Sequence, residues 1–354
     1  MTPLSGSMSL LHTGCQISEN QPDNGKIALY FHLTWPRVMD APKTKRCLGH
    51  RSPHSRQFQF PVKHMIDQQI TVDSPMVREA AVRAIGEDRG PCDITTMVFT
   101  PENVQTRGRI LVKESGILAG IPIAQRVFIE QDVQLKVYVL AEDGSPLIPG
   151  QSVMEISGNL GSILTAERSA LNFLQHLSGI ATLTARFIEV LQGTKCRILD
   201  TRKTTPGLRH LEKYAVRCGG GTNHRYGLYD MFLVKDNHFA AYGAYADRTT
   251  LTQAIAKARE FDPDAKIEFE ADTLKQVELF AELGIDRILL DNMTLEETAS
   301  AVRLVNGRCE LEASGNMTLD RIRKVADTGV DFISVGALTH SVKALDFSLE
   351  ILPP

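Results

Sequence analysis

A short apolar run followed by a helical pattern recurs about every 20 residues in the second half of the chain. Each run ends abruptly in polar or glycine residues. Alternation of strand and helix at this period predicts parallel strands that are buried on both faces, and therefore a β/α barrel or a doubly wound sheet. We count seven runs, which are CRILD (196–200), AVRC (215–218), FLVKD (232–236), KIEFEA (266–271), RILLDN (287–292), CELEASG (309–315) and DFISVGA (331–337).

Polar residues collect at the ends of these runs, where both folds place their ligand site. The first three ends carry cations and hydrogen-bond donors, the next two carry one carboxylate each, and the last two carry serine and glycine. In chain order the candidate site residues are Arg202, Lys203, His224, Arg225, Lys235, Glu270, Asp291, Ser314, Gly315 and Gly336.

Each group of residues matches one part of a ligand. Converging Arg and Lys side chains suit a small substrate with more than one carboxylate, since a guanidinium binds a carboxylate in a fork. Two carboxylates on adjacent strand ends suit Mg²⁺ or sugar hydroxyls, because Mg²⁺ takes few protein ligands and relies on substrate phosphates for the rest. Glycine with serine after the last strands is the usual phosphate site of a barrel. Together these groups predict a phosphosugar that meets a polycarboxylic acid.

Each of these residues also has an ordinary structural explanation. A single Arg or Lys is usually a solvated surface charge, and Glu270 alone could be a salt-bridge partner. A lone Ser-Gly is a turn, and GGG alone is a flexible loop. The coincidence of polar or glycine residues at seven successive strand ends favours a functional site.

Length and composition exclude several classes of protein. The 354 residues are enough for about two domains, and 43% hydrophobic with 23% charged residues is typical of a soluble globular protein. No apolar run approaches the 18 or so residues of a membrane span. A net charge of −3 lacks the positive excess of a nucleic-acid binder, so we expect small-molecule substrates and neither nucleic acid nor membrane as partners.

The first 64 residues differ from the rest of the chain. They carry eight Lys or Arg against three acids and show neither a helical nor a strand period. We therefore expect a poorly ordered extension, with a targeting peptide or a true start at Met65 as alternatives. The six cysteines are scattered without a CxxC pair, which favours a reducing compartment and predicts a cytoplasmic protein.

From Met65 the pattern becomes that of a folded protein. Residues 65–180 predict a small sheet domain with helices on one face, residues 181–340 carry the repeated units, and residues 341–354 form a last segment that packs back on the first domain. Ser74 is expected to cap a short helix, and Thr165 a long helix that ends at Leu191. The expected strands are 109–113, 133–141 and 153–156, with a turn at 142–145 before the last strand.

At the residues of the candidate site, the chain resembles the quinolinate phosphoribosyltransferase family. The resemblance covers about residues 75–352, and eight segments carry it in the right order. These segments are KESGILAG (113–120), AERSALNFLQHLSGIAT (166–182), DTRKTTPGLR (200–209), GGGTNHRYGLYD (219–230), LVKDNH (233–238), the acidic pair in IEFEA and LLDN, EASGN (312–316) and SVGALTHSV (334–342).

The resemblance implies a fold and a reaction. The fold is an open-faced α+β sandwich followed by a TIM-like, incomplete seven-stranded β/α barrel. The reaction is a pentosyl transfer from phosphoribosyl pyrophosphate to quinolinate with loss of the 2-carboxylate, giving nicotinate mononucleotide, pyrophosphate and CO₂. Cys92, where the family often has glycine, and the first 64 residues depart from the family pattern.

The resemblance also implies a role for each residue. Arg168 would reach the site of the neighbouring subunit, so that a homodimer, which could assemble further into a hexamer, is required for activity. Lys203, Glu270 and Asp291 would be the catalytic residues, with Mg²⁺ held by the two carboxylates partly through substrate. The substrate carboxylates would be bound by Arg202, His224, Arg225 and Lys235, and the 5′-phosphate by Ser314, Gly315 and Gly336.

Three other functions compete with this interpretation. A related phosphoribosyltransferase for nicotinate or another ring would share the phosphosugar half of the site, but a monocarboxylate needs fewer cations. A barrel lyase would need Lys235 or Lys203 as a Schiff-base amine. A non-catalytic sensor would be expected to have lost Glu270 or Asp291, and both are present.

Overall fold

The computed structural model describes residues 70–239 and 247–352. The predicted extension of residues 1–64 lies outside these ranges. The described residues belong to one compact unit. In the described part of the chain, none of the helices combines the length and the apolar character that crossing a membrane requires.

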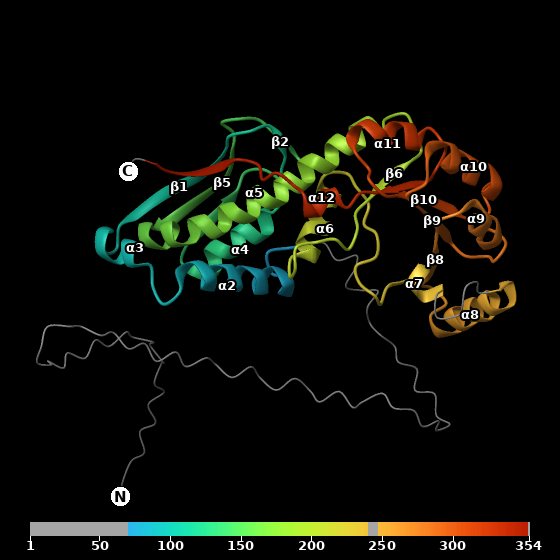
Figure 1. Ribbon diagram of the computed structural model, residues 1–354. Helices are drawn as coiled ribbons and strands as arrows, with labels where there is room; N and C mark the ends of the chain where they lie inside the picture. The colour runs from blue at the N-terminus through green and yellow to red at the C-terminus, as the bar shows by residue number, and fades with distance from the viewer. Residues whose placement is uncertain (1–69, 240–246, 353–354) are drawn as a thin grey trace, which may run out of the picture. The chain divides into compact units, whose positions relative to one another are not determined.

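A four-stranded antiparallel sheet lies in the N-terminal half (Figure 1). Its order is β12–β1–β5–β3, so the last strand of the chain pairs with the first, for example at Arg109 and Glu350. Buried positions alternate with more exposed ones along β1, as in a sheet with one packed face. The strands are β1 (Gln105–Val112), β3 (Lys136–Val139), β5 (Ser152–Asn159) and β12 (Phe347–Leu352), beside a short pair of β2 (Gly116–Ile117) and β4 (Pro146–Leu147).

Helices cover one face of this sheet. Helices α4 (Ile121–Gln131) and α5 (Leu160–Val190) contact its strands, and α2 (Pro75–Arg89) packs on both helices. Ser74 is the N-cap residue of α2, as predicted, and the apolar stripe of α2 is buried. The short helix α3 (Ile94–Phe99) contacts α5. The open-faced sandwich that the sequence predicted is therefore confirmed.

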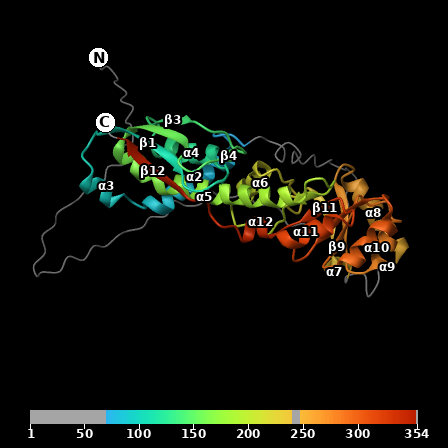
Figure 2. The same cartoon turned by 90° about the horizontal axis from the view of Figure 1, so that it is seen from above.

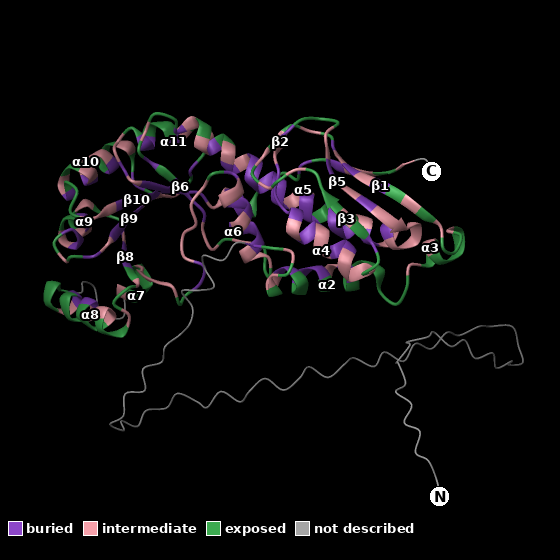
Figure 3. Ribbon diagram, turned by 180° about the vertical axis from the view of Figure 1, so that it is seen from behind, coloured by how far each residue is buried: buried purple, intermediate pink, exposed green. Residues whose placement is uncertain are grey.

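The 31-residue helix α5 joins the two halves of the fold (Figure 2). It contacts β1 and β5 in the first half, and α6 and α11 in the second. Its predicted stripe is buried, including Leu171, Leu174 and Leu177 (Figure 3). The predicted cap at Thr165 is wrong: the side chain of Asn159 caps the helix by accepting the N–H of Ser162 at 3.0 Å, so the N-cap lies at residue 159 and not at residue 165.

A six-stranded parallel sheet forms the core of the C-terminal half. Its order is β6–β11–β10–β9–β8–β7, and within the described residues β6 and β7 are its two edges. The strands are β6 (Arg197–Leu199), β7 (Met231–Val234), β8 (Lys266–Ala271), β9 (Arg287–Asp291), β10 (Glu310–Ser314) and β11 (Phe332–Ser334). The helices are α6 (Arg209–Cys218), α7 (Asp236–Phe239), α8 (Arg248–Phe261), α9 (Leu274–Phe280), α10 (Leu295–Val305), α11 (Leu319–Ala326) and α12 (Ala337–His340).

The predicted strand at 215–218 is wrong, because these residues end helix α6. Leu211 and Ala215 are buried four residues apart, which is the spacing of one helix face. Where we expected a seventh strand, the structure has a single parallel bridge between Thr222 and Leu199. The other six runs contain strands, so the described residues form a sheet of six strands.

Two glycine-to-alanine substitutions should change stability in opposite directions. A Cβ at Gly179 of α5 would lie 2.4 Å from the carbonyl oxygen of Lys343, so we expect Gly179→Ala to lower the free energy of unfolding by about 1–3 kcal/mol. A Cβ at Gly86 of α2 would meet nothing within 4 Å, so Gly86→Ala should raise the free energy of unfolding by about 0.5–1 kcal/mol. Urea unfolding of both variants measures these changes, and a stabilising Gly179→Ala would contradict the close approach.

Candidate active site

The carboxyl ends of the parallel strands bring most of the predicted site residues to one edge of the sheet. Glu270 lies near the end of β8, and Asp291 and Ser314 are the last residues of β9 and β10, where they pair in register. Lys235 directly follows β7 and donates a hydrogen bond to Glu270. This edge therefore combines a cation with carboxylates on adjacent strands.

The segments that follow β6 and β11 meet at the same edge. The hydroxyl of Thr339 donates a hydrogen bond of 2.7 Å to the carbonyl of Lys203. A Cβ at Gly336 would lie 3.1 Å from Cδ of Lys203 and from Nε2 of His340, so the side chain of Lys203 lies against a bare backbone. Gly315 has a φ of +98°, and a Cβ there would lie 2.1 Å from Oδ1 of Asn292. A larger residue at Gly315 would therefore be both strained and blocked.

Two of the predicted cations lie close to each other. Arg225 is half-buried, and burial together with the neighbouring charge of Arg202 lowers the pKa of its guanidinium. Nη1 of Arg225 donates to the carbonyl of Met231 at 3.3 Å. Nε of Arg202 is buried and has no hydrogen-bond partner in the described part of the chain. Two guanidinium groups that repel each other are suited to an anionic ligand between them.

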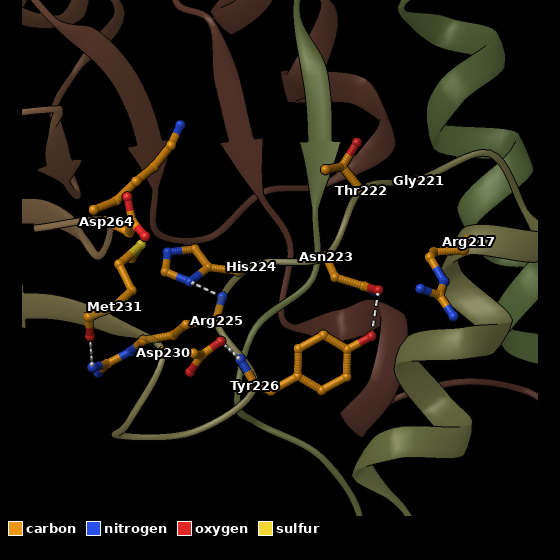
Figure 4. Close-up of a pocket in the computed structure, with 11 residues that line it drawn as sticks. Arg217, Gly221, Thr222, Asn223, His224, Arg225, Tyr226, Asp230, Met231 and Asp264 are labelled. Atoms are coloured by element: carbon orange, nitrogen blue, oxygen red, sulfur yellow. Dashed lines mark hydrogen bonds between the residues drawn. The ribbon is translucent and has the colours of Figure 1, made fainter. Parts of the chain in front are cut away.

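A cavity of about 490 Å³ contains His224 and Arg225 (Figure 4). Its walls include Met231 and Lys266, the first residues of β7 and β8, so this part of the cavity lies at the opposite strand ends from Lys235 and Glu270. The other predicted residues do not line this cavity. Arg168 is exposed on α5, and we find no contact in the described ranges between it and another predicted site residue.

His224 lies above two buried carboxylates that sequence reasoning missed. Its Nε2 atom is 3.1 Å from Oε2 of Glu268 and 3.4 Å from Oε2 of Glu312. Burial opposes the charged ring, but the carboxylates outweigh burial and raise the pKa of His224 to about 9. Nδ1 accepts the N–H of Arg225 at 2.7 Å, a bond that a second ring proton would displace. The hydrogen bond requires Nδ1 to carry no proton, so while it is formed the ring holds its single proton on Nε2, which faces the two carboxylates.

These three side chains form a group that could hold a metal ion. Their ligand atoms lie within 4.8 Å of one another, and we find no other such group in the described ranges. Arg287 occupies one side of the group, because its Nη1 donates to Glu312 at 3.1 Å. Burial raises the pKa of Glu268, whereas His224 and Arg287 lower the pKa of Glu312 against the effect of its burial.

A period of two along the strands could have revealed the missed carboxylates. Glu268 lies two residues before Glu270, and Glu312 two residues before Ser314, so each shares a strand face with a predicted site residue. Both are fully buried within the sheet. The acidic residues inside the apolar strands are therefore the sequence signal for this group.

A buried ion pair anchors the segment that carries His224 and Arg225. Nζ of Lys213 on α6 donates to Oδ1 of Asp200 and, at 2.9 Å, to the carbonyl of His224. Asp200 also accepts the N–H of His224 at 2.8 Å and the side-chain amide of Asn223 at 2.6 Å. Burial raises the pKa of Asp200 and lowers that of Lys213, and the ion pair opposes both shifts.

Comparisons with known proteins find relatives that match both halves of the chain. Residues 93–178 match the family model of the quinolinate phosphoribosyl transferase N-terminal domain, and residues 180–350 match that of the C-terminal domain. The chain is 43% identical over 282 residues to the chloroplastic nicotinate-nucleotide pyrophosphorylase [carboxylating] of Arabidopsis thaliana, covering 76% of this chain and 80% of the relative. The nicotinate-nucleotide pyrophosphorylase [carboxylating] of Mycobacterium leprae is 41% identical over 280 residues, which are 77% of this chain and 96% of the relative.

A solved structure is similar as well. The nicotinate-nucleotide pyrophosphorylase from Francisella tularensis superposes with a TM-score of 0.73 at 37% identity, covering 80% of this chain and 98% of the other. The similarity therefore extends over both domains and includes the strand ends that carry the candidate site.

The buried pair should be sensitive to loss of one partner. Lys213→Met leaves the carboxylate of Asp200 buried without a counter-charge, so we expect a loss of about 3–5 kcal/mol in the free energy of unfolding. Lys195→Met is the matched control, since Lys195 is 70% exposed and pairs with Asp331 at 3.1 Å. It should cost at most about 1 kcal/mol. Equal losses in chemical unfolding would contradict the anchoring role of Lys213.

Proposed function

The chain belongs to the quinolinate phosphoribosyltransferase family, and we propose that its strand-end site joins quinolinate to phosphoribosyl pyrophosphate. The products are nicotinate mononucleotide, pyrophosphate and CO₂, in a step of NAD biosynthesis. The observation that carries the proposal is the juxtaposition, at one edge of the parallel sheet, of basic side chains with the carboxylates of Glu270 and Asp291. A dicarboxylic acid and a phosphosugar need these two kinds of group side by side.

The cations of the site would bind quinolinate. Arg202 and Arg225 are close enough for their charges to interact, and both are partly removed from solvent. His224 and Lys235 complete the basic half of the site. A carboxylate between guanidinium groups gains from charge-assisted hydrogen bonds, and the half-buried position strengthens them. These residues would fix the ring so that its nitrogen faces the ribose.

The other half of the site would bind the phosphosugar. Glu270 and Asp291 offer carboxylate oxygens on adjacent strands, a donor set that fits Mg²⁺ and ribose hydroxyls. When bound there, Mg²⁺ would supply positive charge that favours the departure of pyrophosphate. The backbone at Ser314, Gly315 and Gly336 would hold the 5′-phosphate, because no side chain at the glycines blocks the approach of an anion.

The reaction then follows from charge. The pyridine nitrogen forms a bond to C1 of the ribose as the bond to pyrophosphate breaks, and Glu270 and Asp291 stabilise the positive charge that develops on the sugar. Lys203, which lies against Gly336, would neutralise phosphate oxygens near the reacting centre. The bond to the 2-carboxylate breaks next, its electron pair is accepted by the positively charged ring, and the ring carbon takes up one proton. The basic side chains hold the ring during this step.

A homodimer is part of the proposal. Helix α3 exposes four large apolar side chains, which is unusual for a surface that faces only water. Arg168 is exposed on α5, the helix that α3 contacts. A second copy that covers α3 could receive Arg168 in its own site. The exposed residues of α3 are Ile94, Met97, Val98 and Phe99, at 72%, 68%, 72% and 82% exposure.

The cytoplasm is the location that we propose. Cys92, Cys196, Cys218 and Cys309 are free thiols, which suits a reducing compartment. The names of plant relatives place those proteins in the chloroplast or the mitochondrion, so the location is a separate question from the activity.

Release of CO₂ tests the proposed reaction. The protein should release CO₂ from carboxyl-labelled quinolinate when phosphoribosyl pyrophosphate and Mg²⁺ are both present, and chelation of Mg²⁺ should abolish the release. Nicotinate in place of quinolinate should give no mononucleotide, because it lacks the second carboxylate that the cations bind. Equal use of nicotinate would favour the competing phosphoribosyltransferase, and CO₂ release without the phosphosugar would contradict the order of steps.

Subunit mixing tests the shared site. Arg168→Ala and Lys203→Ala proteins should each be inactive, and exchange of subunits between them should restore activity. A mixed dimer pairs an intact Arg168 from one chain with an intact Lys203 from the other and so regains one complete site. The control mixes two preparations of Lys203→Ala, which should stay inactive. If exchange is demonstrated by mass spectrometry and no activity returns, Arg168 acts within its own chain.

A further inference from the structure

Both ring nitrogens of His224 are engaged inside the protein. Nε2 contacts Glu268 and Glu312 at 3.1 and 3.4 Å, and Nδ1 accepts the N–H of Arg225 at 2.7 Å. The side chain is 7% exposed. The ring thus connects two buried carboxylates to the backbone of Arg225. Figure 4 shows the hydrogen bond between His224 and Arg225, which both line the cavity.

We propose that Glu268 and Glu312 are positioning residues, which hold the ring of His224 so that it fixes the backbone of Arg225 and places the Arg225 guanidinium for the substrate carboxylate. The proposal rests on the proposed function, since it concerns the binding of quinolinate. It adds a task within the protein to the place of His224 in the basic half of the site.

Glu268 has few other groups that could balance its charge. Neither of its carboxylate oxygens has a hydrogen bond of standard geometry in the described part of the chain. Its neighbours are His224 at 3.1 Å, the guanidinium of Arg287 and the like charge of Glu312. Burying a carboxylate with so little compensation is costly, so such a group persists where it serves another purpose.

Glu312 connects the ring to the sheet. Oε2 of Glu312 accepts from Nη1 of Arg287 at 3.1 Å, and the guanidinium of Arg287 lies 4.0 Å from the ring centre of Phe332. Arg287 is therefore held by contacts on β10 and β11, and Glu312 is held by Arg287. The position of His224 is in this way determined by the packed interior of the sheet.

Glu310 offers a matched comparison. It lies on β10 two residues before Glu312 and also accepts from Arg287 at 3.1 Å, but its second partner is Lys266 at 3.0 Å. Glu310→Gln and Glu312→Gln therefore make the same chemical change beside the same arginine, and Glu312 is the member of this pair that contacts His224. Glu310 is 34% exposed and Glu312 is 1% exposed, so a purely structural role would change the stability of the two variants to different extents but would not weaken quinolinate binding more than phosphosugar binding.

Calorimetric titration with quinolinate and, separately, with phosphoribosyl pyrophosphate tests the proposal. We expect Glu312→Gln and Glu268→Gln to weaken quinolinate binding by about fivefold to tenfold, and Glu310→Gln by less than about twofold. Binding of the phosphosugar should stay within about twofold in all three. A variant that had lost its fold would bind both ligands more weakly, so it would be distinguished from one in which quinolinate binding alone is affected.

A double-mutant cycle tests whether the effect passes through Arg225. Arg225→Ala alone should weaken quinolinate binding strongly, and adding Glu312→Gln should weaken it little further, because the carboxylate acts through the side chain already removed. Full additivity of the two changes, or equal effects of Glu310→Gln and Glu312→Gln, would overturn the proposal.

Amide exchange separates this proposal from the proposed function. Glu312→Gln should speed hydrogen exchange at the Arg225 amide, as measured by mass spectrometry with fragmentation, whereas Glu310→Gln should not. This measurement needs no substrate. If the unmodified protein binds no quinolinate, the proposed function fails, but the exchange rate of the Arg225 amide in the two variants still tests the positioning role of Glu312. An unchanged exchange rate in both variants would refute that role.

Discussion

Charge pairing beneath the carboxyl ends of the parallel sheet is the constraint on which the C-terminal half depends. Glu268, Arg287 and Glu312 lie inside the sheet, and Asp200 with Lys213 lies beneath the segment that carries His224. Each of these charges would be costly to bury alone. Because each has a partner on another element, the pairs fix how β6, α6 and the strands β8–β10 sit relative to one another.

Much of the fold followed from periodicity. The parallel strands and the stripe on α5 gave strong patterns, because a strand buried on both faces and a helix with one apolar side are difficult to imitate by chance. The prediction of a strand at residues 215–218 was wrong because a run of four largely apolar residues fits a strand or a helix end equally well. The predicted cap of α5 was wrong because Asn159 and Thr165 are both suitable N-cap residues, and the apolar stripe does not show which of them begins the helix.

The residues at the ends of the strands could be predicted from the sequence. Lys235 beside Glu270, and Asp291 in register with Ser314, follow from parallel strands of known ends. The interior carboxylates were not predicted, because a buried carboxylate needs a partner, and His224, the partner of Glu268 and Glu312, lies on a segment far from both along the chain.

The pairing of β12 with β1 has a consequence for how the protein is made. The N-terminal sheet takes an edge strand from residues 347–352, and Gln175 of α5 accepts the N–H of Leu345 at 2.9 Å. During translation, the first domain therefore emerges from the ribosome before the strand that completes its sheet has been synthesised. The sheet has an unpaired β1 edge throughout synthesis of the C-terminal half, and edges of this kind attract other chains. The pairing of β12 with β1 is thus the last step that protects the first domain from aggregation during synthesis.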